Sequence, residues 1–279
     1  MLTSHLARLG LTCPACRAPG RSGAPLHVRL ALHTESSRAG DDLIEGLLAC
    51  PACARTHPIL DGVAIVVPDL AAWAAAQLEP ALRRHDASPL IERLLESAAA
   101  ADSSFGRERR ALAAVVEAQW RDREIGAELA PADSFARQYL QRLAALPTPP
   151  SGVWLDVGCG AGRGTLQLAA VGAELAVGVD GDIALLRRAE QARRTGEVIW
   201  PRHGDGRTIV EATAEAGDLP RERVAFLCVD HAALPFADHA LAGAIAVEVR
   251  DRGAAPPIDR AELDRVVVVG GPVIRSGPA

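Results

Sequence analysis

The sequence has no lysine, and aromatic side chains are scarce. All thirty basic residues are arginine, and aromatic residues make up 3% of the 279 positions. Thirty-five acidic residues give a formal net charge of −5, and no long part of the chain has the arginine excess of a nucleic-acid platform. No apolar run approaches the ~20 residues of a membrane span, and the N-terminus lacks a charged region followed by an apolar core. We therefore expect a cytoplasmic protein that does not enter a membrane.

A glycine-rich stretch from Val153 to Ala169 organises the second half of the chain. The apolar run Val153 to Val157 predicts a strand, a turn with glycine at 158, 160, 162 and 164 follows, and a helical pattern begins at Thr165. Glycine permits the sharp turn and lets a ligand lie against the main chain and the helix N-terminus. The stretch predicts a site for a nucleotide-like cofactor.

A second apolar run, Leu175 to Val179, ends in Asp180. An acidic residue at the tip of the second strand of a βαβ unit is placed to accept hydrogen bonds from ribose hydroxyls. Counted from Gly158, the last position of a dinucleotide fingerprint falls on Arg163, which is too bulky for the close packing that glycine or alanine permits there. The spacing therefore disfavours NAD.

The same segment resembles motif I of the class I S-adenosylmethionine-dependent methyltransferases, Asp-x-Gly-x-Gly-x-Gly. The resemblance implies an α/β fold with a Rossmann-like, mostly parallel sheet. It also implies that the turn faces the methionine half of the cofactor and that Asp180 binds the ribose. The cofactor contacts predicted in this region are Asp156, Gly158, Cys159, Gly160, Gly162 and Asp180.

A third predicted strand, Val224 to Val229, is followed by Asp230-His231-Ala232-Ala233-Leu234-Pro235-Phe236. This run resembles the Asp-x-x-x-Leu-Pro-Phe segment of small-molecule methyltransferases such as those of quinone biosynthesis. The resemblance implies that Asp230 meets the adenine amino group of the cofactor. An ordinary cap at the strand end is the alternative for this carboxylate.

Three side chains are candidates for a general base, which a hydroxyl acceptor would need. Glu248 follows the predicted fourth strand, Leu241 to Val247, at the end where open parallel sheets place their chemistry. His203 and Asp205 lie in the long connection 198–220, which predicts either a lid or a solvated insertion. The base-methylation motifs Asn/Asp-Pro-Pro-aromatic and Pro-Cys are missing around Glu248, which favours a small-molecule acceptor over a nucleic acid.

Two matching knuckles, Cys13-Pro14-Ala15-Cys16 and Cys50-Pro51-Ala52-Cys53, are separated by thirty-three residues. Each knuckle points two thiolates at one place, and two knuckles complete the tetrahedral sulfur shell of a structural Zn²⁺. In a cytosolic chain this pattern favours metal over disulfides, with free or redox-active cysteines as the alternative. The predicted metal ligands are Cys13, Cys16, Cys50 and Cys53.

After the second knuckle, an Asp61-Gly62 turn leads into a β-branched strand that ends at Pro68. Together with the first knuckle, this run resembles the small zinc-ribbon activator subunit of tRNA and translation-factor methyltransferases, over about residues 8–70. The resemblance implies a ribbon that docks on a methyltransferase by strand pairing, here within one chain. The gap between the knuckles, around 40–48, has room for the helix that this family usually inserts.

Three domains are predicted: a zinc ribbon at 1–70, a helical linker or cap at 71–150, and a cofactor-binding domain at 151–279. Asp259 to Val269 and the strand after Gly271 resemble the last helix and fifth strand of the methyltransferase fold. Since that family continues with a further helix and two strands, we expect a sheet shortened at its C-terminal end, whose open edge can pair with a second copy or a protein partner. The predicted helices of the middle part are Leu70–Leu78, Pro89–Ala100, Arg107–Leu129 and Ser134–Leu146.

The sequence therefore favours a methyltransferase acting on a small-molecule acceptor, with a structural zinc ribbon. Two alternatives stay open. One is a non-catalytic activator or binding protein with a degenerate methyltransferase fold. The other is an RNA methyltransferase that grips RNA with its ribbon, which the near-neutral charge of the ribbon argues against.

Overall fold

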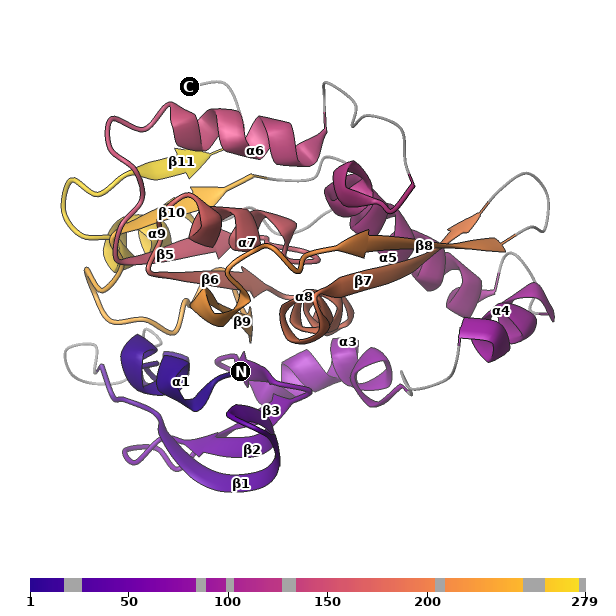
Figure 1. Cartoon of the computed structure of the whole chain (residues 1–279). Helices are drawn as coiled ribbons and strands as arrows, with labels where there is room; N and C mark the ends of the chain where they lie inside the picture. Colours follow the sequence, from indigo (N-terminus) through magenta and orange to yellow (C-terminus); the bar gives the residue numbers. More distant parts are fainter. Residues whose placement is uncertain are drawn as a thin grey trace.

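The computed structural model describes residues 1–17, 27–83, 89–98, 103–126, 134–203, 209–247 and 259–275 (Figure 1). Its centre is a parallel sheet in which the strands follow the order β9-β6-β5-β10-β11. This is the third, second, first, fourth and fifth strand of a doubly wound sheet, so the predicted Rossmann-like α/β fold is confirmed. The strands are β5 (Val153–Val157), β6 (Leu175–Asp180), β9 (Val224–Val229), β10 (Gly243–Ala246) and β11 (Val273–Arg275).

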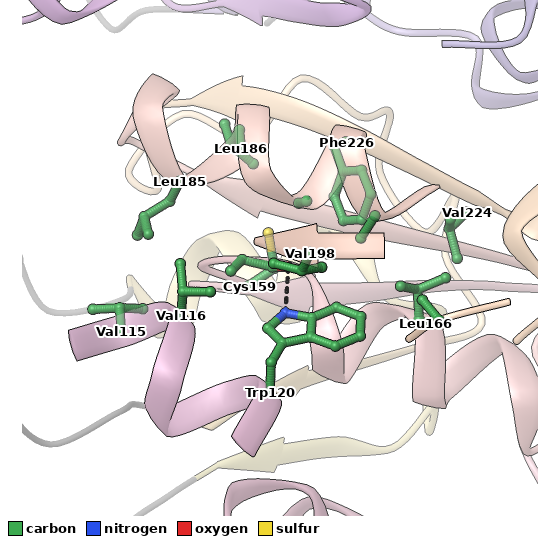
Figure 2. Close-up of a cluster of buried hydrophobic side chains, with 14 of the residues drawn as sticks. Val115, Val116, Trp120, Cys159, Leu166, Leu185, Leu186, Val198, Val224 and Phe226 are labelled. Carbon is green, nitrogen blue, oxygen red and sulfur yellow. Dashed lines mark hydrogen bonds between the residues drawn. The ribbon is translucent and has the colours of Figure 1, made fainter. Parts of the chain in front are cut away.

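Both faces of this sheet are buried, as a parallel sheet requires. Trp154 and Phe226 belong to one hydrophobic cluster, which Figure 2 shows in part, whereas their neighbours Leu155 and Leu227 belong to another. The first cluster includes side chains of the helices that follow β5 and β6, and the second includes side chains of the first and last helices of the chain. These helices are α7 (Arg163–Ala170), α8 (Ile183–Thr195), α1 (Thr3–Leu9) and α9 (Arg260–Val266).

The N-terminal part continues the same sheet. Four strands run antiparallel to one another, and the last of them pairs in parallel with β9, Ala64 opposite Leu227 and Val66 opposite Val229. The strand pairing that the ribbon resemblance implied is thus present within one chain, and all nine strands form a single sheet. The division into three domains stays a prediction. The four strands are β1 (Ala31–Ala39), β2 (Asp42–Ala49), β3 (Thr56–Leu60) and β4 (Val63–Val66).

The middle part is helical, as predicted, but the helix expected over Arg107–Leu129 ends at Trp120, and Glu124 forms a β-bridge with Ala214 instead. Helices α3, α5 and α6 begin at side-chain caps supplied by Asp69, Ser103 and Ser134. Among the described residues, every helix is too short or too polar to cross a membrane. The helices are α3 (Leu70–Leu82), α4 (Pro89–Ala98), α5 (Ser104–Trp120) and α6 (Phe135–Ala144), and the remaining short elements are α2 (Pro14–Arg17), η1 (Arg121–Arg123) and η2 (Arg221–Arg223).

One expectation about a segment is wrong, and for a second segment one of two open alternatives is excluded. The helix expected between the knuckles is the hairpin β1–β2, which turns at Gly40 with a left-handed φ of 59°. The connection after α8 is largely a second hairpin, of β7 (Glu197–His203) and β8 (Ile209–Glu215). Val198 and Trp200 of β7 are buried in the helix-covered core, so this segment is folded rather than a solvated insertion.

Candidate cofactor site and cysteine cluster

The predicted glycine turn connects β5 to α7 and has one open side. Gly158, Gly160 and Gly162 all have positive φ, at 72°, 56° and 81°. A Cβ at Gly162 would come within 2.7 Å of the Phe226 ring, so this position packs against the core. No described atom lies within 4 Å of a Cβ placed on Gly158. The main chain at Gly158 is therefore the part of the turn that a ligand can approach.

Asp180 lies at the tip of β6 and reaches this turn. Its Oδ2 accepts a hydrogen bond of 3.0 Å from the Gly160 N–H, and its Oδ1 accepts one of 2.9 Å from the Asp182 N–H. Burial raises the pKa of Asp180 above its ordinary value. Each carboxylate oxygen keeps further acceptor capacity, so hydroxyl groups of a ligand can still bind there.

Asp156 lies below the turn rather than beside its open side. It is 3% exposed, and its Oδ2 accepts a 2.6 Å hydrogen bond from the Thr165 hydroxyl in the first turn of α7. Burial raises the pKa of Asp156 to about 6, although the Thr165 hydrogen bond opposes the rise. These contacts tie β5 to α7, and a direct cofactor contact by Asp156 stays a prediction.

Helix α5 covers another side of the turn. Its residues Gln119 and Trp120 bind the main chain of the turn, and neither contact was predicted from the sequence. The Gln119 side chain donates to the Cys159 carbonyl over 3.2 Å and accepts from the Ala161 N–H over 2.9 Å. The Trp120 indole, seen in Figure 2, donates to the Ala161 carbonyl over 3.0 Å. A Cβ at Gly160 would lie 2.7 Å from the Gln119 amide nitrogen, so glycine is required there for this contact.

Replacing Gln119 with leucine is expected to destabilise the protein by about 2 kcal/mol. The buried Cys159 carbonyl and Ala161 N–H would each lose a partner, at a cost of ~1–3 kcal/mol per unsatisfied group before the turn relaxes. Gln77→Leu is the control, because within the described part of the chain the buried Gln77 side-chain oxygen has no hydrogen-bond partner. Urea unfolding measures both variants, and equal stability losses in the two would contradict the role given to Gln119.

Asp230 lies exposed at the end of β9, at the same sheet edge as Asp180. One of its oxygens accepts a 2.9 Å hydrogen bond from the Ala232 N–H. Asp230 thus caps the end of the strand, which is the alternative role given above for this carboxylate. This bond uses only part of the carboxylate. On β9 itself Cys228 is a buried core residue, and burial raises the pKa of its thiol to about 12.

The described residues do not test whether the three candidate general bases lie close together. His203 is the last residue of β7, and only its backbone is described. Asp205 and Glu248 lie outside the described residues. Their roles stay predictions.

The four knuckle cysteines converge. Their sulfur atoms all lie within 4.8 Å of one another, with Cys13 3.7 Å from Cys53 and Cys16 3.6 Å from Cys50. A tetrahedral shell with Zn–S bonds of about 2.3 Å has sulfur–sulfur edges of roughly 3.8 Å, so the donor set and its spacing fit zinc. His57 lies beside the cluster, with its Nε2 3.9 Å from the Cys13 sulfur.

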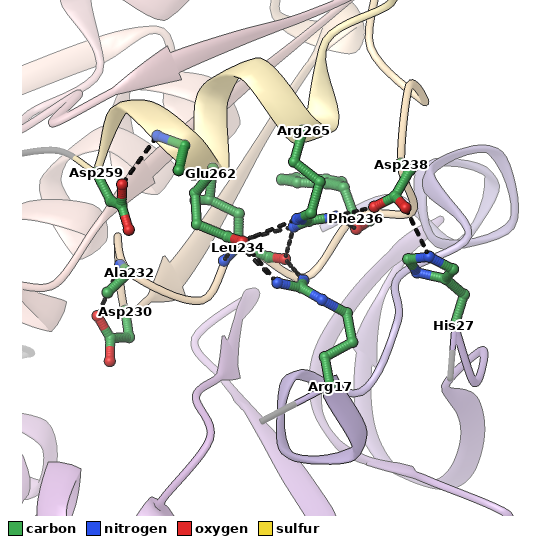
Figure 3. A network of polar contacts seen from close by, with 11 residues as sticks. Arg17, His27, Asp230, Ala232, Leu234, Phe236, Asp238, Asp259, Glu262 and Arg265 are labelled. Carbon is green, nitrogen blue, oxygen red and sulfur yellow. Dashed lines mark hydrogen bonds and ion pairs between the residues drawn. The ribbon is translucent and has the colours of Figure 1, made fainter. Parts of the chain in front are cut away.

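The first knuckle is also bonded to the segment that follows Asp230, as Figure 3 shows. Arg17 donates to the Leu234 carbonyl over 2.6 Å and makes a two-pronged contact with the Glu262 carboxylate at 2.8 and 3.0 Å. Glu262 in turn accepts the Leu234 N–H over 2.8 Å and pairs with Arg265. A main-chain hydrogen bond of 2.9 Å from Thr12 to the carbonyl of residue 235 adds to this contact. Hydrogen bonds and an ion pair therefore connect the knuckle next to the cysteine cluster with the segment after β9.

Comparison with known proteins found matches in structure only, and each match covers part of the chain. No family model and no curated protein matches the chain. A solved complex of the Haloferax volcanii Trm112 methyltransferase activator with a methyltransferase matches at 20% identity over 46% of each chain, with a TM-score of 0.32. The [4+2]-cyclase SpnF matches at 24% identity over 48% of this chain and 42% of its own, with a TM-score of 0.35. An S-adenosylmethionine-dependent methyltransferase of Methanococcus maripaludis matches at 11% identity over 69% of this chain and 68% of its own, also at 0.35. The chain thus spans less than half the length of the first two, and a shared function does not follow from similarity at this level.

Proposed function

We propose that this protein is an S-adenosylmethionine-dependent methyltransferase that acts on a small-molecule acceptor and carries a structural zinc ion in its N-terminal ribbon. The observation that carries the proposal is the open main chain at Gly158 with the Asp180 carboxylate beside the same turn. Both lie at the carboxyl edge of a doubly wound sheet, where such folds bind nucleotide-like ligands. Asp230, at the end of the neighbouring strand β9, supports the same assignment.

Each of these groups has a distinct task in the proposed site. The main chain of the turn lies against the methionine half of the cofactor, Asp180 accepts the ribose hydroxyls, and the remaining acceptor capacity of Asp230 receives the adenine amino group. The bound cofactor supplies an activated methyl group for in-line displacement by an acceptor nucleophile. The chain mainly contributes positioning and exclusion of water. His203, Asp205 and Glu248 are the proposed candidates for taking the proton of a hydroxyl acceptor.

The ribbon has a supporting role in this proposal. Its strand β4 extends the sheet at β9, and Arg17 holds the segment after Asp230. Zinc at the four cysteines would fix the knuckle that carries Arg17. The described sheet ends at β1 on the ribbon side and at β11 on the other side. We propose that a second copy or a protein partner can pair with the outer edge of β11.

Calorimetric titration of the zinc-loaded protein with S-adenosylhomocysteine tests the proposed site. Asp180→Asn is expected to weaken binding about tenfold or more, because hydrogen bonds to a charged acceptor contribute ~1.5–3 kcal/mol. Asp259→Asn is the matched control, since Asp259 caps α9 and the same substitution there leaves the turn intact.

The possible results separate the candidate functions. Absence of binding by a folded, zinc-loaded protein, or equal affinity in the Asp180 variant, would refute the proposed cofactor site. Binding without methyl transfer to any acceptor would favour the non-catalytic activator, and salt-dependent RNA affinity would favour RNA methylation.

A further inference from the structure

A cavity of about 520 Å³ lies along the outer face of α8, away from the side chains assigned to the cofactor. Helices α3, α4 and α5 of the middle part contribute its other walls, and in Figure 1 α3 lies below α8 while α5 and α4 lie to its right. Its volume falls within the roughly 300–1,000 Å³ of small-molecule sites. Apolar side chains from all three helices line it, namely Pro80, Leu95, Phe105 and Leu112.

The described residues that line the cavity include five arginines and two acidic residues, although the whole chain carries −5. Among the described lining residues, the acidic ones are Asp61 and Glu190. Asp61 is already paired with a lining arginine over 2.7 Å, and Glu190 is buried and holds the N-terminal amino group at 3.0 Å. The guanidinium groups that line the cavity belong to Arg83, Arg109, Arg187, Arg188 and Arg194.

Several of these guanidinium groups are held in place by the protein itself. Arg83 and Arg109 both lie over the Phe105 ring, at 5.4 and 5.5 Å from its centre, an arrangement that cation–π attraction stabilises. Arg83 also pairs with Glu79 at 2.8 Å and with Glu108 at 2.9 Å. Arg187 is fixed by Asp61 and by main-chain carbonyls of α3. At the C-terminal end of α8, Arg194 is exposed and has no carboxylate at ion-pair distance among the described residues.

We propose that this cavity binds an organic anion, a molecule that joins a carboxylate, phosphate or sulfonate group to an apolar ring or chain. The guanidinium fork suits planar and tetrahedral oxyanions, and the apolar walls bury the rest of the ligand. The site is separate from the proposed cofactor site, because none of the residues assigned to the cofactor lines it.

Titration of the zinc-loaded protein with 1-anilinonaphthalene-8-sulfonate, an apolar anion whose fluorescence rises in dry sites, tests the proposal. We expect saturable binding of one molecule per chain, unchanged by S-adenosylhomocysteine. Arg194→Glu is expected to weaken binding about tenfold, because it replaces an attractive charge with a repulsive one. Gln191→Trp, which fills the cavity from α8, should abolish binding. Arg260→Glu on α9 is the matched control. The side chain of Arg260 is 77% exposed and does not line the cavity, so this variant should bind the probe like the unaltered protein.

Competition identifies the anionic group. Decanoate and decyl phosphate should both displace the probe, and the tighter of the two shows whether carboxylate or phosphate is preferred. Inorganic phosphate at the same concentration should not displace it, because the apolar walls contribute to binding. Non-saturable probe binding, equal affinity in all variants, or displacement by inorganic phosphate alone would overturn the proposal. None of these results depends on whether the glycine turn binds its cofactor.

Discussion

We expect removal of the metal proposed for the four-cysteine cluster to unfold the part of the ribbon around the two knuckles. The hydrophobic cluster around the sulfur atoms consists of Cys13, Ala15, Cys16 and Cys50, with few partly buried neighbours. So small a core cannot offset the entropy of ordering the chain. Metal binding in such knuckles supplies an apparent ~10–16 kcal/mol, which is folding free energy for the segment.

The effect should extend beyond the ribbon, because β4 belongs to the central sheet. All four residues of β4 are buried, and they cover the edge of β9. If β4 detaches, β9 becomes an unpaired edge next to the proposed adenine contact. Metal removal is therefore expected to weaken S-adenosylhomocysteine binding as well as stability.

Circular dichroism melting and calorimetry, each with and without a chelator, measure these two effects. Cys13→Ser combined with Cys50→Ser should reproduce the chelated state, whereas Cys228→Ala, a cysteine outside the cluster, should keep its metal. An unchanged melting temperature and ligand affinity after complete loss of zinc would contradict this account.

Local signals in the sequence were sufficient for the centre of the fold. The glycine turn and the acidic strand end at Asp180 lie within about twenty residues of each other, and the two knuckles repeat one short pattern. The structure brings together the groups that these signals predicted. The β-branched run of β4 likewise reads as a strand buried on both faces.

The β7–β8 hairpin shows where local signals fail. Pro201 lies within β7, and proline inside a run argues against a strand unless the strand lies at an edge. Among the described strands β7 pairs with β8 alone, so its other side needs no N–H from Pro201. The burial of Val198 and Trp200 depends on helices packed against them, which no pattern within the hairpin reveals.

Contacts between distant segments were also beyond the sequence. Gln119 meets the glycine turn some 40 residues further along the chain, and Arg17 meets Glu262 across 245 residues. The available signals were an arginine directly after a knuckle and a Glu262/Arg265 pair at i,i+3 spacing on a helix. Both patterns usually indicate solvated charges, so their partners emerge only from the folded chain.

The Glu262 network gives the second large effect. Glu262→Gln is expected to destabilise the protein by about 3 kcal/mol, because it leaves the largely buried guanidinium group of Arg17 without its carboxylate and Arg265 with Asp238 alone. Since Glu262 also holds the Leu234 N–H, the segment after Asp230 should loosen, and S-adenosylhomocysteine affinity should fall with stability.

Glu262 also makes the stability of the folded protein depend on pH. Burial alone would raise the pKa of Glu262, but Arg265 and Arg17 outweigh burial, so the pKa lies below its ordinary value of 4.5. A carboxyl group with a lowered pKa in the folded state contributes stability that is complete above the pKa of the unfolded chain and is lost as pH falls through the folded value. The stability contributed by Glu262 is therefore lost below about pH 4.5, and the variant should show a flatter acid limb.

Urea unfolding between pH 3 and pH 7 measures both parts of this prediction. Glu174→Gln is the matched control, because Glu174 forms an exposed ion pair with Arg8 and the loss should stay under about 1 kcal/mol. Equal stability of the Glu262 variant and the unaltered protein at pH 7, or parallel pH profiles, would show that the network does not hold the ribbon to the sheet. The Glu262 variant can also be unfolded in the presence of a chelator. If the chelator causes no further loss of stability in this variant, the cysteine cluster acts on the segment after β9 through Arg17 and Glu262.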